Sequence, residues 1–201
     1  MQRIAGKFAV LAALWACPVA GDVLSLTPDL TEVRLTLDGQ EVVIARAQGE
    51  TGLMCPPDCI QPMVAADGVE TYGPVEVVRF LQEDVAARTG LLLDVRLPAG
   101  FAAGHLPGAL NIPGVTLAAE NAYQRDILLA LGARDAGGTL AFDVAPVLAI
   151  YAAGPAQDDA VRAVQALVAA GYPAQKLRFF RGGMQEWLQF GLTVSVPAQE
   201  G

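Results

Sequence analysis

The first part of the chain alternates between apolar and polar positions. Residues 33–37 follow a period of two, and a second apolar run, 42–45, comes after the pair Asp38-Gly39. Such alternation is typical of a half-buried strand, and Asp-Gly is a common two-residue hairpin turn. The pattern therefore predicts a β-hairpin. The stretch 49–73, which is rich in Pro and Gly, predicts an ordered loop or linker.

From residue 74 onward, apolar residues at helical spacing alternate with short unbroken apolar runs. The predicted strands are 91–93, 147–151 and 177–180. The predicted helices cover 74–89, 121–131, the segment of Val161, Val164, Leu167 and Val168 that stops at Gly171, and a short segment with Trp187 and Phe190. Strands that alternate with helices imply right-handed crossovers and a parallel sheet covered on both sides.

Composition narrows the chemistry. With 201 residues, 53% hydrophobic and 17% charged, the chain is long enough for one domain with a sizeable core. It holds one histidine, two serines, two lysines and three cysteines. These few residues argue against a zinc site, which needs three or four ligands close together, and against a serine triad. The net charge of −8 and the scarcity of lysine argue against nucleic acid as a partner.

The first residues have the layout of a secretory signal peptide. Two basic residues precede the unbroken apolar run 8–16, and small residues follow up to Gly21, so residues 1–21 are predicted to be removed on export, most simply to the periplasm. The apolar run is too short for a membrane span, so none is expected after cleavage. Bulky Trp15 argues against a lipid anchor on Cys17. Cleavage would lower the basic count from 13 to 11 against 21 acidic residues, which gives a net charge of −10.

Two segments of the second half resemble the signatures of the rhodanese superfamily of sulfurtransferases. Residues 92–96 and 101–113 are similar to the amino-proximal signature, and 181–187 to the carboxy-proximal one. The residues that we single out in them are Asp94, Arg96, Gly104, His105, Pro107, Gly108, Arg181, Gly182, Gly183 and Trp187. The resemblance implies an α/β, rhodanese-like fold with a five-stranded, mainly parallel sheet and helices on both faces. We therefore divide the chain into the signal peptide, a hairpin and loop section over 22–73, and a rhodanese-like domain over 74–201.

The resemblance also locates the site. In active members, the strand matching 147–151 is followed by a cysteine that carries a persulfide, in a loop whose N–H groups and following helix favour an anion. Here that loop consists of Ala152, Ala153, Gly154, Pro155, Ala156, Gln157, Asp158 and Asp159. It is similar to a subgroup pattern Cys-x-Gly-Pro-x-Cys but lacks both cysteines, at Ala152 and Gln157. A methyl group cannot hold a persulfide, so the resemblance implies a vestigial loop that has lost sulfur transfer.

The charges of the loop point the same way. Asp158 and Asp159 stand where the next helix begins, where they would cap its free N–H groups and fill the anion site with negative charge. Even a cysteine placed at position 152 would have its pKa raised by these carboxylates, which would also repel thiosulfate. We therefore name no catalytic residue, and the sequence favours a protein that is not an enzyme.

Several signature residues admit two interpretations. His105 lies among turn-forming residues and is expected to be a structural imidazole, although a lone histidine also invites a general-base role. Asp94 and Arg96 fit an ion pair or loop anchor at a strand end, with a ligand-facing Arg96 as the alternative. Trp187 is expected to pack under the sheet edge rather than to stack on a ligand.

A second candidate site is the segment 54–63, which holds both cysteines left after cleavage. An exported location favours a structural disulfide between Cys55 and Cys59, which requires a turn after Pro57 because an extended segment would hold the two Cα atoms about 12 Å apart. The alternatives are a redox or sulfur-relay pair, or a Cu(I) site of both thiolates with Met54 or Met63. The segment also resembles one that precedes rhodanese domains of the same subgroup, which implies no activity.

The leading hypothesis is an exported, catalytically inactive rhodanese-like protein that binds or scaffolds an unidentified protein or small ligand through the vestigial loop. The two alternatives are thiol redox or sulfur-relay chemistry at Cys55 and Cys59, and Cu(I) binding. No cofactor is predicted.

Overall fold

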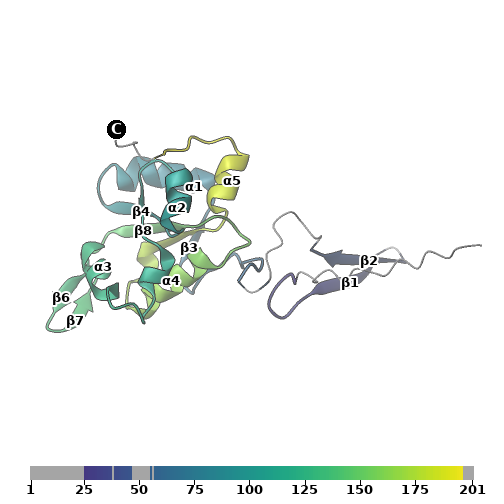
Figure 1. Ribbon diagram of the computed structural model, residues 1–201, viewed down its shortest axis with the longest axis horizontal. Helices are drawn as coiled ribbons and strands as arrows, with labels where there is room; N and C mark the ends of the chain where they lie inside the picture. The colour runs from purple at the N-terminus through teal and green to yellow at the C-terminus, as the bar shows by residue number, and fades with distance from the viewer. Residues whose placement is uncertain (1–24, 38, 47–54, 56, 197–201) are drawn as a thin grey trace, which may run out of the picture.

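The computed structural model describes residues 25–37, 39–46, 55 and 57–196. The predicted signal peptide and Met54 lie outside the described residues. The predicted hairpin is confirmed: β1 (Glu32–Leu37) pairs antiparallel with β2 (Gln40–Ala45), and Leu37 faces Gln40 across a two-residue turn. Figure 1 shows this hairpin standing apart from the α/β domain.

The α/β domain is built on a five-stranded sheet in the order β3-β9-β8-β4-β5, and every pairing in it is parallel. Its strands are β3 (Glu70–Tyr72), β4 (Gly90–Asp94), β5 (Ala109–Asn111), β8 (Val147–Tyr151) and β9 (Leu177–Phe180). The two central strands β8 and β4 are almost wholly buried, as their unbroken apolar runs predicted. The predicted fold class is confirmed.

Helices cover both faces of the sheet (Figure 1). They are α1 (Pro74–Phe80), continued by a π-helical turn (Leu81–Val85), α2 (Pro98–Ala103), α3 (Gln124–Ala130), α4 (Asp159–Ala169) and α5 (Gly183–Gln189), with 3-10 turns at Gly114–Leu117 and Ala174–Lys176. One core joins the sheet to α3 and α4, and the other joins it to α1 and α5. A small antiparallel hairpin, β6 (Arg134–Ala136) and β7 (Thr139–Ala141), lies outside the main sheet.

Some elements differ from the sequence prediction. The edge strand β3 lies within the stretch 49–73 that we interpreted as loop, because three residues are too few to show a period. The three-residue strands β5, β6 and β7 were not predicted for the same reason, and neither was α2, whose six residues are less than two helical turns. In α1 the buried side chains are Val77 and Phe80, whereas Val75 and Val78 of the predicted stripe are exposed. None of the helices among the described residues has both the length and the apolarity that crossing a bilayer requires.

Candidate functional site

The loop 152–158 leaves the central strand β8 and enters α4, at the carboxyl end of the sheet. The Ala152 side chain is buried. The carbonyl oxygens of Ala152 and Ala153 accept hydrogen bonds from the N–H groups of Met184 (3.0 Å) and Gln185 (2.8 Å) in the first turn of α5. This part of the loop is therefore fastened to α5, and position 152 does not open to solvent.

Gly183 makes that close approach feasible. Its φ is +54°, and a β-carbon there would overlap the carbonyl oxygen of Ala152. A side chain would be strained by the backbone conformation and would also push the loop away. The second glycine of the 181–187 signature is thus required by the contact between α5 and the loop.

The start of α4 is acidic. Asp158 occupies the N-cap position of α4, but its side chain makes no capping hydrogen bond, contrary to our expectation, and one of its oxygens lies 3.7 Å from Arg162 instead. Burial raises the pKa of Asp159, and the negative charge of Asp158 raises it further, with a smaller contribution from Asp58. Asp58 reaches this place from the Cys55–Cys59 segment, so the two candidate sites are neighbours.

Cys55 and Cys59 form a disulfide, with their Cα atoms 4.6 Å apart. The chain turns back after Pro57, whose carbonyl oxygen accepts the Cys59 N–H at 3.0 Å. The turn that the disulfide hypothesis required is present. Cys59 and Asp58 are buried, whereas Met63 is exposed.

Residues 57–62, which we call the strap, bind directly to the loop. The Gln61 N–H donates to the Pro155 carbonyl (2.8 Å), and the Arg181 Nε donates to the Gln61 carbonyl (2.9 Å). The Gln61 side chain donates to the Cys59 carbonyl (2.9 Å), so it stabilises the turn of the strap itself. Sequence reasoning missed Gln61, because a single glutamine between Ile60 and Pro62 carries no pattern.

Asp94 and Arg96 form an ion pair at the end of β4. The Asp94 carboxylate is fully buried and accepts the guanidinium in a two-pronged arrangement, with Nε 2.9 Å from Oδ1 and Nη2 2.5 Å from Oδ2. The same guanidinium donates to the Gly104 carbonyl, and the Asn111 amide donates to the Asp94 and Arg96 carbonyls. The structure places Arg96 in a strand-end ion pair, with its donors directed at the protein.

Two other signature residues, His105 and Trp187, pack against aromatic side chains. His105 stacks on Phe101, with ring centroids 3.8 Å apart, and its Nδ1 lies 3.1 Å from the Phe101 carbonyl oxygen. Its backbone pairs with Ser195, so the ring and the main chain are both engaged. Trp187 is buried edge-on to Phe180 and donates its indole N–H to the Thr193 carbonyl. These contacts give both residues structural roles.

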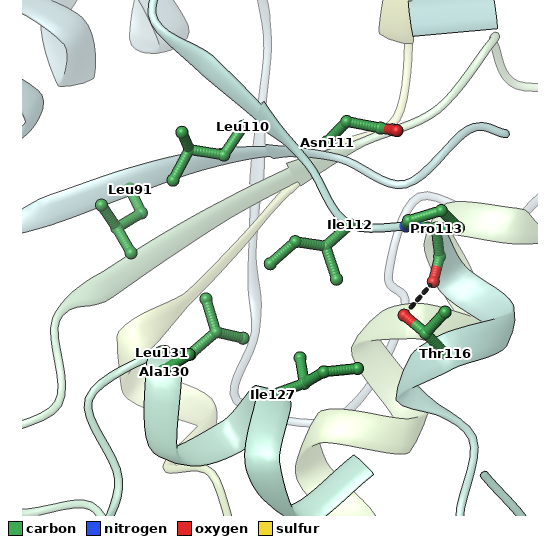
Figure 2. A pocket seen from close by; sticks show the side chains of 9 residues that line it. All are labelled: Leu91, Leu110, Asn111, Ile112, Pro113, Thr116, Ile127, Ala130 and Leu131. Carbon is green, nitrogen blue, oxygen red and sulfur yellow. Dashed lines mark hydrogen bonds between the residues drawn. The ribbon is translucent and has the colours of Figure 1, made fainter. Parts of the chain in front are cut away.

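Two hollows on the domain differ in their position relative to the loop. A polar hollow of about 180 Å³ lies beside the loop and the strap; it is lined by Pro155, Arg181, Gly182, Gln185, Glu186 and Gln189. An apolar hollow of about 430 Å³ lies between the edge strand β5 and α3. Figure 2 shows aliphatic side chains such as Leu91, Ile112 and Ile127 directed into this space, while the Thr116 hydroxyl is bound to the Pro113 carbonyl. None of the residues that line the apolar hollow belongs to the loop 152–158 or the strap.

A family model described as the rhodanese-like domain matches residues 76–190, more than half of the chain. The chain belongs to the rhodanese-like domain family. The match covers both signatures and the 152–158 loop of this rhodanese-like protein. A comparison with curated protein sequences finds no match.

Several solved structures are similar to this chain at low sequence identity. A Bacillus halodurans protein is 17% identical (TM-score 0.47; 63% of this chain, 77% of that chain). A thiosulfate sulfurtransferase from Pseudomonas aeruginosa is 20% identical (0.46; 64% and 20%). The rhodanese-like domain of an Anabaena protein is 18% identical (0.44; 67% and 83%).

The arrangement limits the chemistry of both candidate sites. At the loop, Ala152 contributes a buried methyl group, and Asp158 and Asp159 contribute carboxylates at the start of α4, so these residues supply no thiol to act as a nucleophile. At the strap, the closed disulfide leaves neither sulfur as a thiolate, and the described residues contain no group of three or more His, Cys, Asp or Glu side chains placed to hold a metal ion. The hydrogen bonds that join the described loop residues to α5 and to the strap are all made by main-chain groups.

Proposed function

We propose that this rhodanese-like protein is exported, has no thiosulfate sulfurtransferase activity, and binds a protein or small ligand at the face formed by the loop 152–158. The observation that carries the proposal is the buried Ala152 at the end of β8, in the position that the family gives to its nucleophile. The fold around it is intact, including the Asp94–Arg96 ion pair and the junction with α5. A scaffold that is kept while its nucleophile is absent favours binding over catalysis.

Sulfur transfer from thiosulfate to cyanide, measured on the mature protein, tests the loss of activity. We expect turnover at the level of the buffer alone. Ala152→Cys should remain close to that level, because Asp158 and Asp159 disfavour a thiolate and repel thiosulfate. Adding Asp158→Asn and Asp159→Asn to Ala152→Cys should raise the rate above that of Ala152→Cys. Turnover of the natural protein at the level of an active rhodanese would refute the proposal.

Photo-crosslinking tests the binding role. A crosslinking amino acid in place of Gln157, on the loop, should give a discrete adduct in cells that produce the protein. The same group in place of Tyr123, an exposed residue at the start of α3, is the matched control. Equal adducts from both positions, or none from position 157, would contradict binding at the loop face.

Export is tested by the mature N-terminus. The periplasmic fraction should hold a chain that starts close to residue 22, as the layout of residues 1–21 predicts. A protein that stays in the cytoplasm and still begins at Met1 would contradict export.

A second candidate function, thiol redox chemistry or sulfur relay, is favoured by the closed Cys55–Cys59 disulfide and by the contact of its strap with the loop. Titration of the pair in glutathione buffers decides it. A midpoint near those of catalytic dithiols, above about −230 mV, would support this function, whereas a midpoint below about −300 mV would mark an inert structural bridge.

A further inference from the structure

The strap is hydrogen-bonded to the α/β domain by the two main-chain polar groups of a single residue, Gln61. Gln61 donates its N–H to the Pro155 carbonyl, and its own carbonyl oxygen accepts from Arg181, so the domain supplies one acceptor and one donor for one main-chain residue. The Gln61 side chain is turned back to Cys59 and contributes nothing to this recognition. The domain therefore contacts main chain here, and a different residue in the place of Gln61 could make the same two hydrogen bonds.

We infer that the loop face is a binding site for an extended peptide main chain, that the strap occupies this site in the oxidised protein, and that reduction of the disulfide releases the strap. The inference rests on the proposed binding function and adds to it the class of partner and its control. The hollow lined by Arg181, Gln185, Glu186 and Gln189 lies directly beside Pro155 and has room for one polar side chain of a peptide. The strap thus acts as an intramolecular competitor.

The disulfide is placed to control this competition. It closes the turn that begins at Pro57, and its buried second cysteine, Cys59, lies only two residues before Gln61. A dithiol reductant would transfer two electrons and two protons: its own disulfide forms, the Cys55–Cys59 bond breaks, and two thiols result. Without that bond the turn is no longer covalently fixed, so the ordering of Gln61 has to be supplied by hydrogen bonds alone.

Amide hydrogen exchange of the mature protein measures release of the strap, because the Gln61 N–H is itself the donor to Pro155. Reduction with dithiothreitol, and separately the Cys55→Ser, Cys59→Ser double variant, should speed exchange of the Gln61 amide by about tenfold or more. The Ile150 amide, in the central strand β8, is the internal control and should not change. Unchanged exchange at Gln61 in both cases would overturn the proposed control by the disulfide.

Peptide binding measures the site itself. The probe is a fluorescein-labelled peptide of residues 57–63 in which serine replaces Cys59, followed by anisotropy. The double serine variant should bind it about tenfold or more tightly than the oxidised protein, because a site that is mostly covered lowers the apparent affinity by its open fraction. Arg181→Gln in the double variant should abolish binding, whereas Arg79→Gln, an equal loss of charge at an exposed position of α1, should not.

Each remaining outcome is informative. If the double variant binds neither the peptide nor a scrambled peptide of the same composition, the main-chain site is refuted; crosslinks from position 157 would then still support the proposed binding function. Equal binding of both peptides would also refute the main-chain site, because it would show that binding depends on composition and not on the order of the residues. If the peptide binds as expected while position 157 gives no adduct in cells, the site exists and the proposed function fails.

Discussion

At the scale of single residues, the buried carboxylates of this protein behave in opposite ways. The Asp94 carboxylate is fully buried but accepts hydrogen bonds from the Arg96 guanidinium and from the Arg96 N–H. Asp159 is partly buried beside another carboxylate, with only the more distant Arg162 to offset it. A buried charge with a hydrogen-bonded partner is tolerated, whereas one that faces like charge costs stability.

Removal of the cation from the first of these pairs should be costly. We expect Arg96→Gln to lower the free energy of unfolding by about 3 kcal/mol, because it leaves the Asp94 carboxylate buried without its counter-ion. The control is Arg34→Gln on the exposed hairpin, where solvent screens the ion pairs with Glu32 and Glu41, so its loss of stability should be much smaller than that of Arg96→Gln. Urea denaturation compares the two variants; equal losses would contradict the structural role of Arg96.

The second carboxylate predicts a pH dependence. Because the pKa of Asp159 is raised in the folded protein, its contribution to stability falls as pH rises from the ordinary aspartate value through the raised one. Asp159→Asn has no carboxyl group to titrate at this position. The unfolding free energy of the variant minus that of the natural protein should therefore increase as pH rises through this window, and should stay constant above it. Urea midpoints between pH 3 and pH 7 measure the effect. The control variant is Asp126→Asn, which removes an exposed carboxylate from the first turn of α3.

At the scale of secondary-structure elements, the loop after β8 is held from two sides. The first turn of α5 binds the carbonyls of Ala152 and Ala153, and the strap binds the carbonyl of Pro155. Both contacts use main-chain groups, so the loop keeps its shape although Ala152 cannot act as a nucleophile.

A substitution at the α5 junction isolates one of these contacts. Gly183→Ala should destabilise the protein by about 1 to 3 kcal/mol more than Gly191→Ala, because both glycines have positive φ but only the first would meet the Ala152 carbonyl. Position 191 has open space around it and reports the backbone cost alone. Thermal unfolding of both variants measures the difference. Equal melting temperatures would show that the loop can move away from a β-carbon at position 183 at no cost in stability.

At the scale of the whole molecule, the stability of the α/β domain is largely separate from the redox state of Cys55 and Cys59. The two hydrophobic cores lie between the sheet and its helices, and neither contains Cys55 or Cys59. The hairpin β1–β2 reaches the domain through its base, where Ile60 donates to the Leu26 carbonyl and Arg46 to the Asp58 carbonyl. Reduction of the disulfide therefore acts on the strap and on the attachment of the hairpin.

Reduction should leave the domain folded. A bridge between cysteines only four positions apart closes a short loop, so its loss should cost at most about 2 kcal/mol. Near-ultraviolet circular dichroism, followed during heating with and without dithiothreitol, should show a cooperative transition in both cases. Loss of the near-ultraviolet signal on reduction at room temperature would show that the bridge is needed for the fold.

The sequence by itself determined the elements with a clear period: the β1–β2 hairpin, the buried strands β4, β8 and β9, and, through the two signatures, the parallel sheet and the place of Ala152 at its end. These predictions succeed because the alternation of buried and exposed positions in a strand or helix is visible in neighbouring residues of the sequence. It did not give the three-residue strands, nor the buried face of α1, where Val77 and Phe80 are chosen over Val75 and Val78.

Only the tertiary structure decided that the cysteine segment and the loop form one site. Gln61 meets Pro155 through main-chain atoms, and Arg181 meets Gln61 across 120 positions of sequence. Every residue offers the same backbone carbonyl, so such contacts leave no pattern of side chains to detect. Their partners are fixed by how the packed sheet brings distant segments together, which local sequence does not encode.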